Sequence, residues 1–367
     1  MNFTCTQANL LQALSQVAPV AGRNNQLPVL QHVLLQVRDN ILHLTTTDLE
    51  IGVHSITGGK AMGDGSCTVP ARRLFEFVQQ LPNKHPLVLE KKGNGLKITT
   101  KGFKASFPLA EADEFPLLPD VKPQEAVILE PARFCRALED VLFAASREDV
   151  RPEIRSVFVV AEGGRLRVAA TDSFRLAESV SAYTGGKNFS FILPLPSAQE
   201  VVRLFTAQEE LHVLPYTNHV AFQTDAVELT SRLVDGQYPD YQQIIPRSSS
   251  TEMVVEREAL LRALKTLTVF LPRDSRRVQF EIDPDKNTFR LSVAGSEVGE
   301  GQVDVDVQKI IGEPLTIMLN IQYLLEGVQH MGTKQCRVFF SGQEDPVVIR
   351  PQGPEDMYIY LVMPIQV

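Results

Sequence analysis

Gln12-Ala13-Leu14 occurs twice more in the chain, with only its first residue changed, as Arg136-Ala137-Leu138 and Arg262-Ala263-Leu264. The three copies start 124 and 126 residues apart. Each lies in a segment that opens with a short apolar run and continues with apolar residues at helical spacing, over 3–18, 127–145 and 253–270. Self-similarity at a fixed period indicates tandem copies of one structural module.

Further landmarks keep nearly the same offsets. Alternating apolar residues predict three hairpins, over 33–44, 157–168 and 278–291, with turn residues between their strands. A second helix is predicted to start near Pro70, Pro194 and Asn320, because proline suits a first helical turn and asparagine caps a helix. Two dipeptide pairs also match, at offsets of 124 and 123: Thr47-Asp48 with Thr171-Asp172, and Phe115-Pro116 with Tyr238-Pro239.

These landmarks predict an α+β protein of three tandem modules, each with two helices packed on antiparallel sheets. We place the modules at 1–120, 121–246 and 247–367. The joints at 117–123 and 245–251 both contain proline, and the second also has three consecutive serines, as linkers often do.

Charge is unevenly distributed along the chain. The formal net charge of −8 argues against a simple basic nucleic-acid binder. The six predicted helices contain equal numbers of basic and acidic residues, so the strands and loops carry the whole negative charge. Helices gathered on one face would therefore form a nearly neutral surface, as proximity to DNA phosphates requires. Solvated helix faces without any partner explain the same balance equally well.

Common enzyme motifs are missing from the sequence. It has no G-x-x-x-x-G-K-[ST] phosphate loop, no H-E-x-x-H and no G-x-S-x-G, and its four cysteines lack metal-ligand spacing. No cofactor or metal is expected, and no apolar run is long enough to span a membrane. Asp48 and Asp172 occupy equivalent repeat positions and are expected to be structural. Two alternatives stay open at this point: a metal-dependent DNA enzyme, and a three-module scaffold that never meets DNA.

Five strings, in this order, resemble the DNA polymerase III beta subunit family of bacterial sliding clamps. They are TTTDLE (45–50), VPARRL (69–74), ATDSFRLA (170–177), LVDGQYPDY (233–241) and YLVMPIQV (360–367). The resemblance implies a head-to-tail homodimer that closes into a ring around double-stranded DNA. It implies a non-catalytic, cytoplasmic processivity factor. The implied partners are the DNA polymerase III alpha subunit, the clamp loader, and other polymerases and repair proteins with short clamp-binding motifs.

The resemblance also implies a set of DNA-facing residues. Arg23 and Arg72 match basic positions that touch DNA in the family. Helix position adds four more: Arg73, Arg136, Arg262 and Lys265. The chain departs from the family at Leu195, where a basic residue often follows the proline.

In this family, partners insert a short apolar peptide into a pocket between the second and third modules. The matching positions here are Arg151, Ile154, Thr171, Phe174, Arg175, Leu176, Pro239, Ile244, Pro346, Leu361, Val362, Met363, Pro364 and Ile365. The apolar members would also suit a protein core, but a chain end reading Met-Pro-Ile needs contacts that hold it in place. Phe174 stands where the family usually has histidine, and Gln366 where some members have arginine.

A dimer contact is predicted from charge. The expected edge strand of the first module carries Lys97, Lys101 and Lys104, whereas the matching region of the third module carries Glu297, Glu300, Asp304 and Asp306. Charges of opposite sign at the two ends of one chain favour head-to-tail pairing of two copies. By resemblance, Phe107 and Leu109 would pack on Val269 and Phe270 of the other subunit. Solvated edge charges that only prevent aggregation are the competing explanation.

Overall fold

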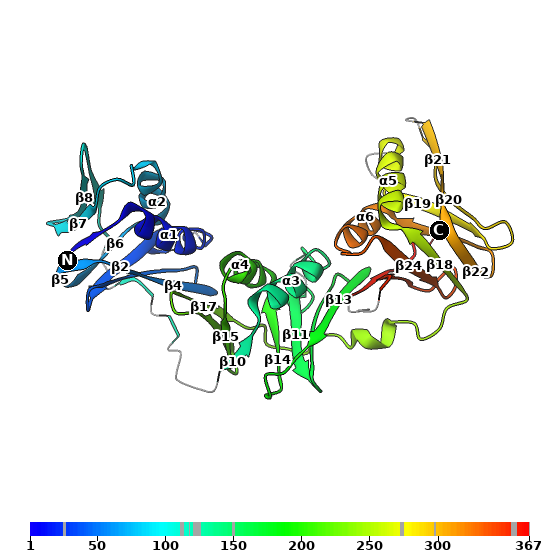
Figure 1. Cartoon of the computed structure of the whole chain (residues 1–367), viewed down its shortest axis with the longest axis horizontal. Helices are drawn as coiled ribbons and strands as arrows, with labels where there is room; N and C mark the ends of the chain where they lie inside the picture. The colour runs from blue at the N-terminus through cyan, green and yellow to red at the C-terminus, as the bar shows by residue number, and fades with distance from the viewer. Residues whose placement is uncertain are drawn as a thin grey trace. The chain divides into compact units, whose positions relative to one another are not determined.

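The computed structural model describes residues 1–24, 27–110, 114–116, 118–119, 126–148, 151–271, 275–296, 299–353 and 358–366. The chain divides into two compact units, Met1–Ala132 with Arg203–Leu233 and Arg133–Val202 with Val234–Val367. Figure 1 labels all six helices and many of the strands. Among the described residues, no helix is long and apolar enough to cross a membrane.

The first unit holds the first module together with the opening strand and the three closing strands of the second. Its elements are β1 (Asn2–Cys5), α1 (Gln7–Val17), η1 (Pro28–Gln31), β2 (His32–Arg38), β3 (Ile41–Thr47), β4 (Ile51–Gly58), β5 (Lys60–Gly63), β6 (Gly65–Pro70), α2 (Ala71–Gln80), β7 (Leu87–Lys92), β8 (Gly95–Thr100), β9 (Phe103–Pro108), β10 (Val127–Leu129), β15 (Leu211–Pro215), β16 (His219–Gln223) and β17 (Val227–Arg232).

The second unit holds the rest of the second module and the third. Its elements are α3 (Pro131–Leu142), β11 (Ser156–Glu162), β12 (Arg165–Thr171), β13 (Arg175–Ala182), β14 (Phe189–Pro194), α4 (Leu195–Phe205), η3 (Tyr241–Ile244), β18 (Thr251–Glu256), α5 (Arg257–Leu267), η4 (Thr268–Phe270), β19 (Arg277–Asp283), β20 (Thr288–Ser296), β21 (Gly299–Val305), β22 (Val307–Gly312), β23 (Leu315–Asn320), α6 (Ile321–Gln329), β24 (Gln335–Phe340), β25 (Val347–Pro351) and β26 (Tyr358–Val362). The helices α3 and α4 each contribute a few residues to the first unit.

One order of elements repeats three times along the chain, in β1–β9, β10–β17 and β18–β26. Each copy has a strand, a helix, a run of strands, a second helix and three closing strands. The three predicted hairpins are confirmed as the antiparallel pairs β2–β3, β11–β12 and β19–β20. The predicted α+β repeat is therefore confirmed.

Local sequence explains the turns and helix starts. Asp39 and Asn40 adopt φ angles of 53° and 61°, which matches a tight hairpin turn that these residue types tolerate. Asn320 caps α6, because its side chain accepts the N–H of Gln322 at 3.0 Å. Pro70 and Pro194 were expected in a first helical turn, but they end β6 and β14. They still pair there, with His32 and Ser156, and the helices begin one residue later.

Two strand pairs join neighbouring modules into continuous sheets. In the first unit β4 pairs antiparallel with β17, within an eight-stranded sheet ordered β10-β15-β16-β17-β4-β3-β2-β6. In the second unit β13 pairs antiparallel with β26, within a nine-stranded sheet ordered β14-β11-β12-β13-β26-β25-β24-β18-β22. We call these pairs the first seam (β4–β17) and the second seam (β13–β26).

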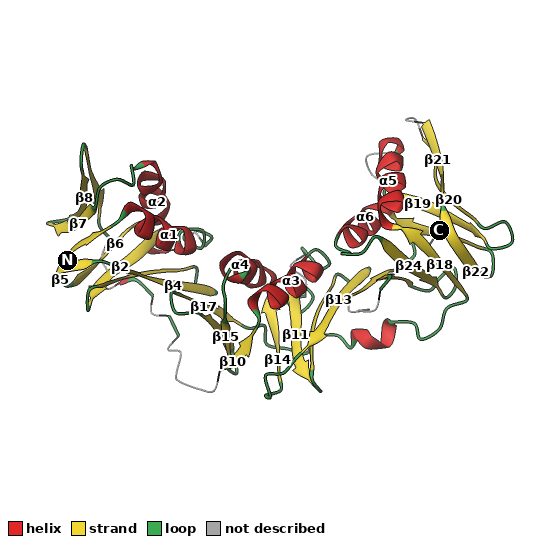
Figure 2. Cartoon of the chain, in the orientation of Figure 1, coloured by secondary structure: helices red, strands yellow, loops and turns green. Residues whose placement is uncertain are grey.

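The helices cover one face of the sheets in each unit. In the first unit α1 packs beside α2 and against β3 and β4, and in the second unit α5 packs beside α6 and against β21 (Figure 2). The predicted apolar stripe of α1 is confirmed as core, because Leu10, Leu14 and Val17 are fully buried.

Candidate functional site

A short turn between β12 and β13 positions the predicted pocket residues around Phe174. Thr171 donates its hydroxyl to the carbonyl of Arg175 at 2.6 Å and accepts the N–H of Ser173 at 3.1 Å. The Asp172 carboxylate accepts the N–H groups of Phe174 and Arg175, both at 3.0 Å. Ser173 has a left-handed φ of 79°, so side-chain bonds hold a conformation that serine rarely adopts. The turn leaves Phe174 62% exposed.

The first module contains the same turn over 47–51. Thr47 donates to the carbonyl of Ile51 at 2.8 Å, and Asp48 accepts the N–H groups of Glu50 and Ile51 at 2.9 and 2.7 Å. Leu49 repeats the φ of 79° seen at the equivalent position. Asp48 and Asp172 thus each hold a backbone turn, which is the structural role predicted for them. Across the described ranges, no cluster of His, Cys, Asp and Glu is arranged to hold a metal ion.

Arg175 ties the second module to the third. Its Nε donates to Asp172 at 2.9 Å, its Nη2 donates to the Phe143 carbonyl at 2.6 Å, and its Nη1 donates to Glu326 on α6. The guanidinium also lies 4.3 Å from the centre of the Tyr323 ring. Burial alone would lower the pKa of Arg175, but the bond to Glu326 and the charge of Asp172 raise it above its ordinary value. Arg175 is therefore permanently charged and fully engaged inside the protein.

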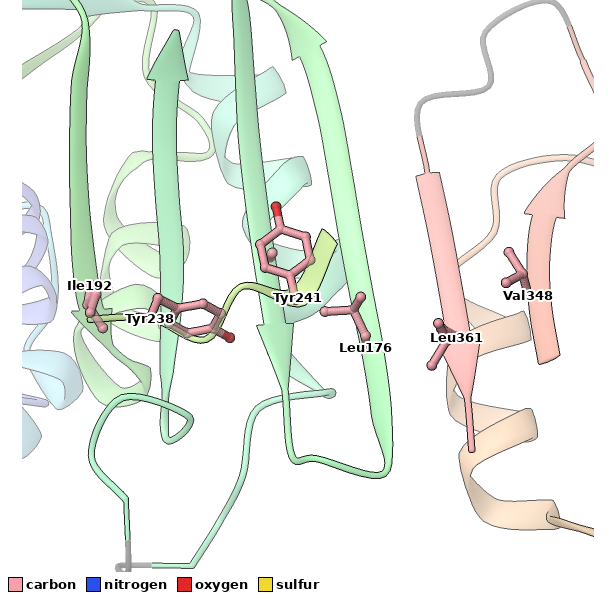
Figure 3. Close-up of a cluster of buried hydrophobic side chains, with 7 residues drawn as sticks. Leu176, Ile192, Tyr238, Tyr241, Val348 and Leu361 are labelled. Atoms are coloured by element: carbon pink, nitrogen blue, oxygen red, sulfur yellow. The ribbon is translucent and has the colours of Figure 1, made fainter. Parts of the chain in front are cut away.

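The second seam lies under an apolar cluster on the sheet. Arg175 faces Val362 across the β13–β26 pair, and Leu176 faces Leu361. The cluster adds residues from other strands and from the segment after β17: Ala169, Leu176, Ile192, Tyr238, Tyr241, Val348 and Leu361. Figure 3 shows Tyr238 beside Ile192 and Tyr241 beside Leu176. Residues far apart in the sequence thus meet at one place.

Two backbone hydrogen bonds hold the residues that follow β26. The N–H of Met363 donates to the Phe174 carbonyl, and the N–H of Ile365 donates to the Met318 carbonyl, both at 2.8 Å. Met363 packs on the cluster, and Pro364 and Ile365 line a hollow of about 400 Å³. The expectation that contacts hold the C-terminal Met-Pro-Ile is therefore met.

The predicted pocket residues divide into two groups by exposure. The buried group consists of Ile154, Thr171, Arg175, Leu176, Leu361 and Val362. The group that reaches the surface, half-buried or exposed, consists of Arg151, Phe174, Pro239, Ile244, Pro346, Met363, Pro364 and Ile365. Arg151 is held over the turn, because its Nη2 donates to the Ser173 hydroxyl at 2.7 Å.

Sequence reasoning missed two residues of this cluster. Tyr238 was used as a repeat landmark and in a family-matching string but was given no role, yet it stacks on Phe158 with ring centres 5.0 Å apart. Tyr241 lies edge-on to Tyr238 and donates its hydroxyl to Glu178 at 2.6 Å. The available signal was two tyrosines three residues apart in an otherwise polar segment, which is typical of a linker that docks on apolar surface.

Comparison with known proteins covers the whole chain. Models of the N-terminal, central and C-terminal domains of the DNA polymerase III beta subunit match residues 1–119, 128–240 and 242–366. The beta sliding clamp of Synechococcus elongatus is 32% identical, over 100% of this chain and 99% of the relative. The chain belongs to the DNA polymerase III beta subunit family of sliding clamps. Such clamps are non-catalytic processivity subunits, so the enzyme alternative is wrong.

Solved clamp structures agree in fold. The DNA polymerase III beta subunit of Pseudomonas aeruginosa superposes with a TM-score of 0.95 at 28% identity, and each chain is covered in full. The Pseudomonas aeruginosa sliding clamp bound to griselimycin gives a TM-score of 0.94 at 27% identity, again with full coverage of both chains. A clamp of this fold therefore accommodates a bound ligand.

The basic residues predicted to face DNA in this clamp are exposed: Arg23, Arg72, Arg73, Arg136, Arg262 and Lys265. Five of them lie on the helices α2, α3 and α5, and Arg23 follows α1. Two of these charges are partly offset, since Arg72 pairs with Glu76 and Arg136 with Asp140, both at 2.9 Å.

The edge residues of the clamp need one correction. Lys97 was predicted on an edge strand, but it lies on β8, which pairs on both sides with β7 and β9. The edge strand is β9, which carries Lys104, and Lys101 lies in the turn before it. In the third module Glu300 and Asp304 lie on the edge strand β21, and Asp304 is bound by Arg290 at 2.7 Å. Glu297 lies outside the described residues.

Proposed function

We propose that two copies of this chain close head to tail into a ring around duplex DNA, and that partners attach to it through a peptide pocket at the second seam. Both seams support the proposal because they use equivalent strands. In each seam the third strand of a repeated β-meander, β4 or β13, pairs with the last strand of the next module, β17 or β26. The third meander strand of the third module, β21, and the last strand of the first module, β9, have no such partner within the described part of one chain. A third seam between β21 of one copy and β9 of another would complete the pattern.

The repeat also gives a register for this third seam. Ile51 pairs with Ser231 in the first seam and Arg175 with Val362 in the second. Counted along the β20–β21 ladder, Gly299 is equivalent to Ile51 and Arg175. Counted along the β8–β9 ladder, Phe107 is equivalent to Ser231 and Val362. In the proposed seam Gly299 would lie opposite Phe107 of the other copy, and Glu300 opposite Ser106.

Charge and apolar surface support the same pairing. In this register Glu300 is the diagonal neighbour of Lys104, at a distance that long side chains bridge. Val269 is 70% exposed beside the edge strand. Phe270 lies against the backbone of β21, since a Cβ at Gly301 would come within 2.5 Å of its ring. On the other edge Phe107 contacts Phe77 of α2, with ring centres 5.6 Å apart, and Leu109 lies half-buried next to it.

The helices supply the DNA-facing surface in this proposal. Arg23, Arg72, Arg73, Arg136, Arg262 and Lys265 would contact phosphates, which carry affinity but no sequence information. A lining with few net charges suits sliding, because every additional phosphate contact strengthens binding at one place. Leu195 removes one possible contact.

The peptide pocket is assigned to the surface around the second seam. Phe174, Ile244, Pro346 and Met363 present apolar surface, while Leu176 and Leu361 form the buried base. The other matched positions complete it: Arg151, Ile154, Thr171, Arg175, Pro239, Val362, Pro364 and Ile365. Short motifs of the DNA polymerase III alpha subunit, the clamp loader, other polymerases and repair proteins would bind here. The proposed location is the cytoplasm, and the proposed modules are 1–120, 121–246 and 247–367.

Retention on DNA tests the ring directly. The protein, loaded by a clamp loader onto nicked circular DNA, should stay bound through gel filtration and should be released when the circle is cut once. A ring slides off a free end, whereas a protein that grips phosphates binds linear DNA equally well. Equal retention on circular and linear DNA would rule out topological binding.

A further inference from the structure

The first seam carries an open hollow. It has a volume of about 580 Å³ and lies on the eight-stranded sheet. Its apolar lining residues are Leu34, Phe115, Pro116 and Leu118, and its polar lining residues are Gln36, Arg38, Thr45, Ser66, His54 and Glu228. We call it the first-seam hollow. All of these residues belong to the first unit.

The repeat explains why the space is open. Leu34, Phe115 and Leu118 are equivalent to Phe158, Tyr238 and Tyr241, which fill the apolar cluster of the second seam. Each residue of the first seam is the smaller of its pair, and Leu118 replaces a whole phenol ring. A site that holds an aromatic side chain in one module is therefore left unfilled in the other.

The residue that binds the Tyr241 hydroxyl at the second seam also differs at the first seam. At the second seam the Tyr241 hydroxyl donates to Glu178 at 2.6 Å. The residue equivalent to Glu178 is His54, which lines the first-seam hollow. An acceptor for a phenol is thus replaced by an imidazole.

A chain of hydrogen bonds from Arg38 through His43 to His54 determines which nitrogen of His54 carries the hydrogen. Arg38 Nε lies 3.0 Å from His43 Nε2, and His43 Nδ1 lies 3.0 Å from His54 Nε2. Arginine only donates, so His43 Nε2 accepts and its Nδ1 carries the hydrogen. His54 Nε2 therefore accepts in turn, and His54 Nδ1 is left as a donor. Burial and the charge of Arg38 lower the pKa of both rings, which keeps them neutral.

Glu228 adds a carboxylate to the lining of the hollow, next to His54. It faces His54 across the β4–β17 pair and is held by Gln223 and by Thr230. The hollow thus offers apolar side chains, a cationic donor at Arg38, a neutral donor at His54 and a carboxylate at Glu228.

We infer that the first-seam hollow binds an aromatic residue that carries a free carboxylate and an N–H group, as at the C-terminal end of a partner polypeptide. The ring occupies the space that Tyr241 fills at the second seam, against Phe115 and Leu118. The carboxylate accepts from Arg38 and His54, and the N–H of the same residue donates to Glu228. A free N-acyl aromatic amino acid presents the same groups, so the two sources are separated by experiment.

Titration of the full-length protein with small probes tests this assignment. N-acetylphenylalanine should bind and shift the imidazole NMR signals of His54, whereas its carboxamide should bind at least about tenfold more weakly, because it loses charge-assisted bonds. A pentapeptide ending in phenylalanine should bind more tightly than N-acetylphenylalanine, as a polypeptide ligand requires. Equal affinity for acid and amide, or no His54 shift, overturns the inference. Tighter binding of the free acyl amino acid than of the peptide overturns the polypeptide source.

Two variants locate the site. Leu118→Tyr restores the ring found at the second seam and should abolish binding by filling the hollow. Arg38→Gln should weaken the binding of N-acetylphenylalanine at least about tenfold. The affinity for its carboxamide should stay unchanged. Arg232→Gln is the matched control, because Arg232 lies at the same seam outside the hollow, and it should leave both affinities unchanged. Binding that survives both Leu118→Tyr and Arg38→Gln overturns the site. Retention on circular DNA should be normal in all three variants.

Discussion

Arg175 is the residue on which the largest local loss of stability is expected. Its guanidinium is buried between Asp172 and Glu326, and it also satisfies the Phe143 carbonyl. Arg175→Met would leave two carboxylates without their partner, and breaking a buried ion pair costs about 3–5 kcal/mol in the free energy of unfolding. Urea unfolding measures this difference. Arg165→Met is the control, since Arg165 is exposed on β12 and its replacement should change stability by less than about 0.5 kcal/mol. Equal losses for the two variants would contradict the role of Arg175.

His43 should make folding stability depend on pH. Burial, then the charges of Arg38 and the neighbouring His54, lower the pKa of His43 from 6.5 to about 4. As pH falls below 6.5 the unfolded chain binds a proton at this residue, while the folded protein does not until about pH 4. The titration of His43 therefore leaves the free energy of unfolding unchanged above pH 6.5 and lowers it progressively between pH 6.5 and 4. Thermal unfolding at pH 7 and pH 5 should show a smaller fall in Tm for His43→Gln than for the unchanged protein, and identical falls would refute the lowered pKa.

At the scale of elements, the register of the third seam can be tested by cross-linking. Ser106→Cys and Glu300→Cys in one chain should form a disulfide between two copies under mild oxidation, because opposite residues in an antiparallel pair lie within disulfide distance. The four native cysteines are buried and free, so they should not compete. Ala105→Cys with Glu300→Cys is the out-of-register control, with side chains on opposite faces, and should not cross-link. Cross-linking of the control pair alone would mean that the strands pair in another register.

The elements also show how far the sequence carries the prediction. Periodicity and turn residues predicted the three hairpins and the helices, because short-range patterns determine those structures. The seams were not predicted, since pairing β13 with β26 joins segments that are almost two hundred residues apart and carry no local mark of their partner. The roles of Arg175 and Tyr241 depend on that pairing. Arg175 carries a charge and Tyr241 carries a hydroxyl group, and such residues are usually exposed. The sequence pattern alone therefore did not predict that either side chain is buried.

At the scale of the whole molecule, ring closure and partner binding should be separable. The proposed dimer contact lies at the ends of the chain's sheets, around Phe107 and Val269, whereas the proposed pocket lies at the second seam. Phe107→Ala with Val269→Asp places an unpaired charge in an apolar contact, which costs several kcal/mol and should give folded monomers. These monomers should still bind a Gln-Leu-x-Leu-Phe peptide, because the residues of the proposed pocket all belong to one chain.

Removing residues 363–367 should have the opposite effect, with the dimer intact and peptide binding lost. Each large apolar side chain that the pocket buries is worth about 1.5–3 kcal/mol, so a peptide with a few of them should bind with micromolar affinity, near −8 kcal/mol. In the proposed pocket Met363 would form one wall, and Met363→Ala alone should cost about 1–3 kcal/mol in peptide binding. Calorimetry gives the peptide affinity and sedimentation gives the oligomeric state. If the truncated protein binds the peptide normally, the C-terminus is only a tail and the pocket lies elsewhere. If the double variant remains a dimer, the contact between copies has been misplaced.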